Sequence, residues 1–278
     1  MSPVAYRLSL TLAAVSAAGC LAALASPGAI RSPAVTVGNM QGTALVLLVV
    51  TLPVLLSSLV GVSRGHRAFI IGWVGALGSI AYQGVLFLFG TPFNPFFHLY
   101  VAMLSLASWA ILAVAVALPV HDIESTLGRN APRRLIAGYL VVNAAAFGAL
   151  WLRATGTGAL GPMPPAFLDG TGMQTGPVQV LDLAYTLPLM LLAAYRLLTS
   201  RPWGRVLTGS LLVMLAIETT SIGVDQWMGA AADPASPAAS ATLAPVFAIL
   251  TVVGVAVLGL FVRPGSSRVV TRRTLPAS

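Results

Sequence analysis

Long apolar runs separated by short polar turns make up most of the chain. A helix needs about 20 apolar residues to cross a hydrocarbon layer about 30 Å thick. Eight runs reach this length, at 8–26, 43–62, 68–90, 98–120, 135–153, 177–198, 205–228 and 240–262. The pattern predicts an all-α fold, a polytopic integral membrane helix bundle of eight transmembrane helices forming a single domain over residues 1–262, followed by a basic tail at 263–278.

The composition excludes an ordinary soluble domain. Of the 278 residues, 57% are hydrophobic and only 8% are charged, whereas soluble domains contain about 25% charged residues. The lipid bilayer is therefore the first partner that the sequence predicts.

The positive charge comes entirely from arginine and predicts an orientation. The formal charge of +8 lies in short turns and forms no stripe or recognition motif, so we expect no nucleic-acid partner. Short loops rich in arginine stay in the cytoplasm. With the N-terminus inside, thirteen of the fifteen arginines are cytoplasmic, and Arg31 and Arg153 are outside. We expect a multi-pass protein of the cell inner membrane with both termini cytoplasmic.

The absence of lysine indicates the kind of genome that encodes the chain and excludes one kind of cofactor attachment. Fifteen arginines without one lysine indicate a GC-rich, bacterial genome. No lysine Schiff base can form, which argues against a retinal-binding bundle. The sequence has no phosphate loop, dinucleotide fingerprint or nucleophile elbow, so no cofactor is expected.

The N-terminal run leaves two processing alternatives open. Ala23-Leu-Ala25 resembles a signal-peptide cleavage site, and Ala18-Gly19-Cys20 resembles a lipoprotein cleavage site. The apolar run is longer than a usual signal core, so we expect an uncleaved first helix.

Two runs share a motif that suggests an internal duplication. The second run contains Thr51-Leu-Pro53 and the sixth contains Thr186-Leu-Pro188, and each continues to a short basic turn that leads into the next run. The hypothesis is a 4+4 repeat, two four-helix halves in the same orientation. Parallel repeats of this kind occur in transporters.

Three of the seven acids lie inside apolar runs. Asp182 and Asp225 lie near the outer ends of the sixth and seventh runs, and Glu218 lies near mid-membrane, seven residues before Asp225 on the same helix face. An ionisable group at the bilayer centre costs roughly 2.5–3.5 kcal/mol on insertion scales. Such groups face a protein interior or a wet cavity, and we expect these three to face one outward-open pocket.

A second group of polar residues lies at the same outer level. Tyr82 and Gln83 belong to the third run, and Asn94 before Pro95 is typical of a helix start. The candidate residues for binding a substrate or cation are Asp182, Glu218, Asp225, Tyr82, Gln83, Asn94, His98 and Tyr185. An aromatic interface belt also accounts for the aromatic ones. No paired-ligand spacing supports a metal site, so no metal is expected.

Three stretches carry a resemblance to a known group of proteins. Phe93-Asn-Pro-Phe-Phe-His-Leu-Tyr100, Leu181-Asp-Leu followed by Pro188, and Arg201-Pro-Trp-Gly204 resemble a group of uncharacterised bacterial multi-spanning membrane proteins. The resemblance implies a membrane helix bundle, and it implies no catalytic residues.

Three functions remain open from the sequence. The first hypothesis is a transporter or binding protein for a cation or small polar solute. The second is a membrane enzyme acting on a lipid-linked or periplasmic substrate, with Glu218 or Asp182 as general acid or base and His98 assisting. The third is a non-catalytic partner or assembly subunit. The clustered acids without a nucleophile favour the first, a protein that is not an enzyme.

Overall fold

The structure is a computed structural model that describes residues 2–161, 165 and 167–263. All regular elements of these residues are helices. The elements longer than three residues are α1 (Pro3–Ala25), η1 (Pro27–Ile30), α2 (Ala34–Val46), η2 (Leu47–Thr51), α3 (Leu52–Ser63), α4 (Ile70–Phe89), α5 (Phe97–Ala117), α6 (Val120–Glu124), α7 (Arg133–Leu160), α8 (Pro177–Leu181), η4 (Asp182–Thr186), α9 (Leu187–Leu198), α10 (Gly204–Ala232) and α11 (Ala244–Val262). The predicted all-α fold is confirmed. The predicted tail lies outside the described residues except for Arg263.

Within the described part of the chain, eight continuous helical segments are long and apolar enough to cross a membrane. They span Pro3–Ala25, Ala34–Ser63, Arg67–Phe89, Phe97–Ala117, Arg133–Leu160, Pro177–Leu198, Gly204–Ala232 and Ala241–Val262. Each contains one of the eight apolar runs or nearly coincides with it. This architecture is compatible with a multi-pass membrane protein.

The second segment begins well before the apolar run that marks it. The run starts at residue 43, whereas α2 starts at Ala34. The intervening residues include Gly38 and Gly42, which lower the apolar content but let α2 approach α10 closely. A Cβ on Gly38 would lie 2.5 Å from the carbonyl oxygen of Met228. Packing against another helix therefore supports a segment that hydropathy alone does not reveal.

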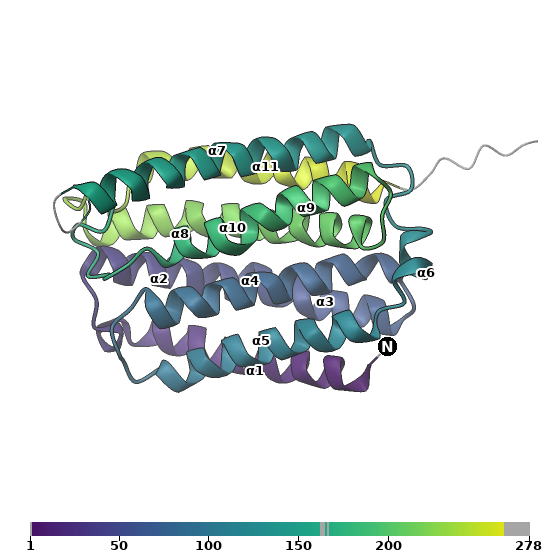
Figure 1. Ribbon diagram of the computed structural model, residues 1–278. Coiled ribbons are helices and arrows are strands. Elements are labelled where there is room, and N and C mark those ends of the chain that lie inside the picture. The colour runs from purple at the N-terminus through teal and green to yellow at the C-terminus, as the bar shows by residue number, and fades with distance from the viewer. Residues whose placement is uncertain (1, 162–164, 166, 264–278) are drawn as a thin grey trace, which may run out of the picture.

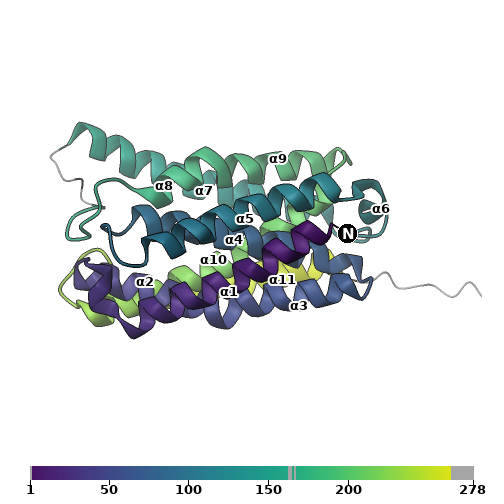
Figure 2. The ribbon, with the colours of Figure 1, turned by 90° about the horizontal axis from the view of Figure 1, so that it is seen from below.

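Helices α4 and α10 form the centre of the bundle (Figures 1 and 2). In the apolar 18-residue stretch of each segment, 61% of the residues are buried in α4 and in α10, against 22% in α7 and 17% in α11. Helix α10 contacts α2, α4, α9 and α11, and α4 also contacts α3 and α5. The other close pairs are α1 with α5 and α7 with α9.

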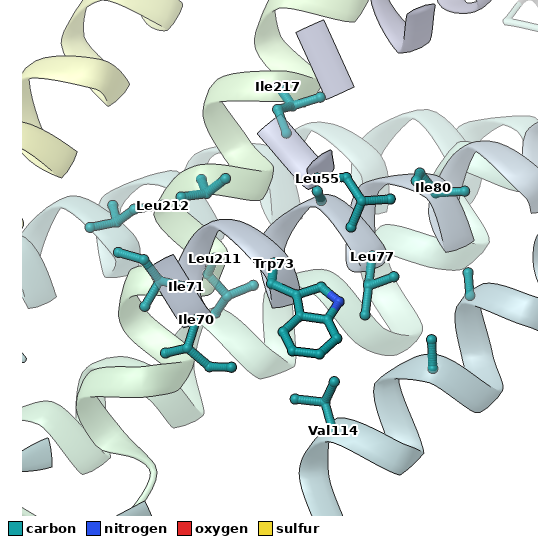
Figure 3. Packing of buried hydrophobic residues seen from close by; sticks show 14 of the residues in the cluster. Leu55, Ile70, Ile71, Trp73, Leu77, Ile80, Val114, Leu211, Leu212 and Ile217 are labelled. Carbon is teal, nitrogen blue, oxygen red and sulfur yellow. The ribbon is translucent and has the colours of Figure 1, made fainter. Parts of the chain in front are cut away.

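The apolar core continues between the central helices and their neighbours. Figure 3 shows Trp73 of α4 beside Ile70, Leu77 and Val114, all of which are buried. The indole Nε1 of Trp73 donates a 2.8 Å hydrogen bond to the Ser9 hydroxyl, which satisfies its one polar atom.

The outer helices carry large apolar side chains on their exposed surfaces. Trp109 is 60% exposed, Leu152 64% and Val252 68%. Water-soluble proteins rarely leave contiguous apolar surface of this kind uncovered, but the acyl chains of a bilayer cover it. The exposed surface therefore agrees with the apolar helices in indicating a membrane protein.

The two ends of the bundle differ in charge. The start of α1, helix α6 and the end of α11 lie at one end (Figure 1). The turns at this end carry Arg64, Arg67, Arg129, Arg201 and neighbouring arginines, and we call it the Arg-rich end. The opposite end, with Arg31 and Arg153, is the Arg-poor end.

The two Thr-Leu-Pro motifs interrupt their helices in the same way. The amide of Leu52 donates to the carbonyl of Leu47, and the amide of Leu187 donates to that of Asp182. Both bonds span five residues and form one π-helical turn in the midst of an α-helix. The proline that follows each motif's leucine has no amide hydrogen and crowds the preceding turn, so the helix widens there.

The Arg-rich ends of the same two segments also match. Helix α3 ends at Ser63 and α9 at Leu198. In the turns that follow, the amide of His66 donates to the carbonyl of Gly61, and the amide of Arg201 donates to that of Arg196, both at 3.0 Å.

Candidate functional site

Close packing of α4 against α10 places the most deeply buried acid. A Cβ on Gly75 would lie 2.7 Å from the carbonyl oxygen of Ser210, so at this level the two backbones nearly touch. Small residues allow such approach between membrane helices. Two turns further along α10, Glu218 lies against α4 and is only 8% exposed.

Both oxygens of Glu218 accept hydrogen bonds from α4. The Ser79 hydroxyl donates to Oε1 at 2.7 Å, and Nε2 of Gln83 donates to Oε2 at 2.6 Å. Ser79 and Gln83 lie one turn apart, so they occupy one face of α4. The carboxyl is thus fixed by two neutral donors.

The other polar atom of the Gln83 side-chain amide is its oxygen, Oε1. This atom is buried and has no hydrogen-bond partner. Buried polar atoms are nearly always paired, so this oxygen is free to accept one further hydrogen bond or to bind a cation. A carboxylate, an amide oxygen and a hydroxyl are the ligands that hard cations prefer.

Asp225 is held at the contact between α10 and α2. The Thr43 hydroxyl lies 3.1 Å from Oδ1 and 3.0 Å from Oδ2, so its single proton is shared between the two oxygens. Gly42 makes this approach possible, because a Cβ there would lie 2.8 Å from the Cα of Asp225.

Asp182 is the first residue of the π-helical turn η4. Tyr82 Oη donates to its Oδ1 at 3.2 Å, and Trp151 Nε1 donates to its Oδ2 at 2.8 Å. These donors come from α4 and α7, so Asp182 joins the second half of the bundle to the central helix α4.

The three acids form a connected series rather than one cluster. Tyr82 and Gln83 are neighbours on α4 and bind Asp182 and Glu218, respectively. Asp225 follows Glu218 by two turns on the same helix. Each acid nevertheless has its own partners.

A cavity of about 590 Å³ opens at the Arg-poor end, between the end of α7 and the start of the sixth segment. Its polar lining comes from Thr155, Gln174, Thr175 and Gln179, and it also reaches Leu183, the residue after Asp182. The lining does not include Asp182, Glu218 or Asp225, so this cavity ends next to the series of acids.

Within the described structure, three of the candidate residues form no hydrogen bond with the acids. Asn94 is buried, and its Oδ1 accepts the amide of Phe96 at 2.9 Å, which holds the turn before α5. Helix α5 begins at Phe97, two residues beyond Pro95. His98 is exposed, with its ring edge-on to that of Phe97, and Tyr185 is 69% exposed.

The sequence did not reveal three of the donors. Ser79, Thr43 and Trp151 bind the acids, yet serine, threonine and tryptophan are common in membrane helices. Ser79 carries one usable signal, because it shares a helix face with Gln83. Thr43 and Trp151 carry none, since their partners lie on distant segments.

Among the described residues, no group of three or more His, Cys, Asp and Glu side chains could hold a metal ion. Cys20 is buried and free. The site of this structure therefore consists of carboxyl groups and neutral donors.

The fold and the site together define a helical bundle, compatible with a multi-pass membrane protein, that contains one buried and two half-buried carboxyl groups. No family model matches the chain, and no curated protein or solved structure matches it either.

Proposed function

We propose that this protein is a transporter for a cation or small polar solute, with Glu218 as the group that binds a proton or cation. One observation carries the proposal: a buried carboxyl is held by Ser79 and Gln83, both neutral, beside the unpaired Gln83 Oε1. A buried charge needs a partner. In this site a proton or a small cation supplies it.

The hypothesis of an internal duplication agrees with the proposal. The motif prolines Pro53 and Pro188 are separated by 135 residues, and Gln83 and Glu218 are separated by the same number. The same shift relates the two π-helical turns, the ends of α3 and α9, and the hydrogen-bonded turns after them. These agreements favour two four-helix halves in one orientation.

The repeat also explains the position of Glu218. In two parallel helices related by a twofold axis along the helices, equivalent residues face each other. Gln83 faces Glu218, and Gly75 faces Ser210, with the same separation. On this argument the axis between the halves runs between α4 and α10, and Glu218 lies on it. Transporters with parallel repeats bind their substrates near the repeat interface.

The proposed orientation has the Arg-rich end in the cytoplasm of a bacterial cell. Asp225 and Asp182 then lie between Glu218 and the outer surface, and the cavity at the Arg-poor end opens to the outside. Rocking of the two halves about the α4–α10 contact would expose Glu218 to either side in turn.

Proton-coupled flux tests this function. The purified chain is reconstituted into liposomes that contain a pH-sensitive dye, and inward gradients of Na⁺, K⁺, Mg²⁺ and methylammonium are imposed in turn. The wild type should change the internal pH in response to at least one gradient. Glu218→Gln, which keeps the side-chain size but not the charge, should abolish that response.

Asp122→Asn is the matched control, because Asp122 is an exposed acid at the Arg-rich end and its variant should behave as the wild type. An equal response of wild type and Glu218→Gln would reject the proposal, as would no response of the wild type to any gradient. His98, which the enzyme hypothesis assigns as the assisting group, is exposed.

A further inference from the structure

A small cavity at the Arg-rich end is lined by three arginines. It has a volume of about 160 Å³ and lies between α6, the end of α9 and the start of α10. Arg196, Arg201 and Arg205 line it together with Ser200 and Glu124. The proposed transport site does not involve these residues.

Two of the arginines are tied to backbone carbonyls. Arg196 Nη1 donates to the Pro202 carbonyl at 2.7 Å, and the Arg205 guanidinium donates to the Glu124 carbonyl. A guanidinium has five N–H donors, so each of these bonds positions the group and leaves other donors free. A fourth arginine, Arg133, donates to the Ser200 hydroxyl at 2.6 Å.

The single acid of the cavity, Glu124, offsets only one of these three positive charges. Glu124 Oε1 accepts the backbone amides of Arg205 at 2.9 Å and Val206 at 3.4 Å. Its carboxylate thus caps the first turn of α10. The three guanidinium groups therefore leave the cavity with a net positive charge.

The backbone around the cavity is held in an unusual conformation. Ser200 has φ 54° and Trp203 has φ 69°, the left-handed region that residues other than glycine rarely adopt. Both flank Arg201. Such conformations persist where the surrounding structure requires them and often occur at ligand clamps.

The corresponding turn of the other half has an apolar cavity instead. That cavity, of about 210 Å³, is lined by Val62, Gly65 and Ile70 with Trp73, and contains one arginine, Arg67. Gln83 and Glu218 are separated by 135 residues. Adding 135 to the numbers of the first three lining residues gives Leu197, Ser200 and Arg205, which line the arginine cavity. Orientation in the membrane requires arginines near the surface, but it does not require three of them around one cavity.

We propose that the cavity of Arg196, Arg201 and Arg205 binds a phosphate group. The planar guanidinium fork matches two oxygens of a phosphate, and several arginines can share its oxygens. The group belongs either to a soluble phosphate or to the headgroup of an anionic phospholipid at the end of the bundle. The proposal is independent of the transport function.

Binding by the full chain in detergent tests this site. One series adds sodium phosphate, with sodium chloride at equal ionic strength as the reference, and follows the unfolding temperature by tryptophan fluorescence. A second series adds phosphatidylglycerol or phosphatidylcholine and counts the bound lipids by native mass spectrometry. Arg196→Gln with Arg201→Gln should weaken binding of the effective probe by about tenfold or more, because hydrogen bonds between charged groups are lost.

The control is Arg64→Gln with Arg134→Gln, two exposed arginines of the same end outside the cavity. It should change the affinity by no more than about twofold. Since Arg196 also holds a turn, Arg201→Gln alone, at an exposed position, serves if the double variant does not fold.

Stabilisation by phosphate alone identifies a soluble ligand, and selective retention of phosphatidylglycerol identifies a headgroup. The proposal is overturned if the wild type responds to neither probe, or if the control loses as much affinity as the cavity variant. The arginines would then serve orientation in the membrane only.

Discussion

The hydrogen bond between Gln83 and Glu218 should be measurable as a coupling free energy. Gln83→Leu removes the 2.6 Å bond to Oε2 and leaves one carboxyl oxygen buried without a donor. Glu218→Leu removes the acceptor of both Ser79 and Gln83. The double variant replaces both partners by apolar groups, which is far less unfavourable than leaving one of them unpaired.

The expected coupling free energy follows from the environment of Gln83 and Glu218. Hydrogen bonds between membrane helices average about 0.6 kcal/mol and reach about 1.7 kcal/mol in double-mutant cycles. Bonds to charged groups contribute about 1.5–3 kcal/mol in other proteins. Because Gln83 is 3% exposed and Glu218 is 8% exposed, little water replaces the lost partner, and we expect a coupling of about 1.5 kcal/mol.

Equilibrium unfolding in mixed micelles, measured for the wild type, both single variants and the double variant, gives this coupling. Gln83→Leu combined with Thr219→Val is the matched control. Thr219 follows Glu218, but its hydroxyl donates to the Leu215 carbonyl and accepts from Thr251 of α11. It shares no partner with Gln83, so the two changes should add within about 0.5 kcal/mol. A coupling as small for the Gln83–Glu218 pair as for this control would refute the contact that the proposed function requires.

Three further predictions concern packing, the acid of the sixth segment and orientation. Gly42→Ala should destabilise the protein by about 1–3 kcal/mol in a thermal unfolding assay, because the new Cβ would meet the α10 backbone at 2.8 Å. Gly138→Ala is the control: a Cβ there meets open space, so this variant should be neutral or stabilising. Trp151→Phe removes an indole donor at 2.8 Å and should cost about 1 kcal/mol in unfolding free energy, whereas an unchanged stability would mean that the bond is not formed. In whole cells, a membrane-impermeant maleimide should label Ser236→Cys and not Ser125→Cys; the reverse pattern would invert the proposed orientation.

Local properties of the sequence determined the eight helical segments. Lipid offers no hydrogen bonds to the backbone, so a run of about 20 apolar residues has to form a helix. The segment at Ala34–Val46 shows the limit of this argument. Its Gly38 and Gly42 lower the hydropathy. They allow α2 to pack closely against α10, and no local property of the sequence reveals that contact.

The sequence also identified three acids within apolar runs, where a carboxyl is unfavourable wherever its partner lies. It did not determine the partners. Ser79, Thr43 and Trp151 are separated from their acids by 139, 182 and 31 residues, and only the packing of the helices brings them together.

Rotation about the helix axis was likewise decided by the tertiary structure. The sequence predicts that His98 and Tyr185 bind a substrate or cation, but their side chains are exposed. Length and hydropathy determine how deep a residue lies in the membrane. Which way it faces depends on the neighbouring helices, and for Glu218 that neighbour is α4, at the contact between the two proposed halves.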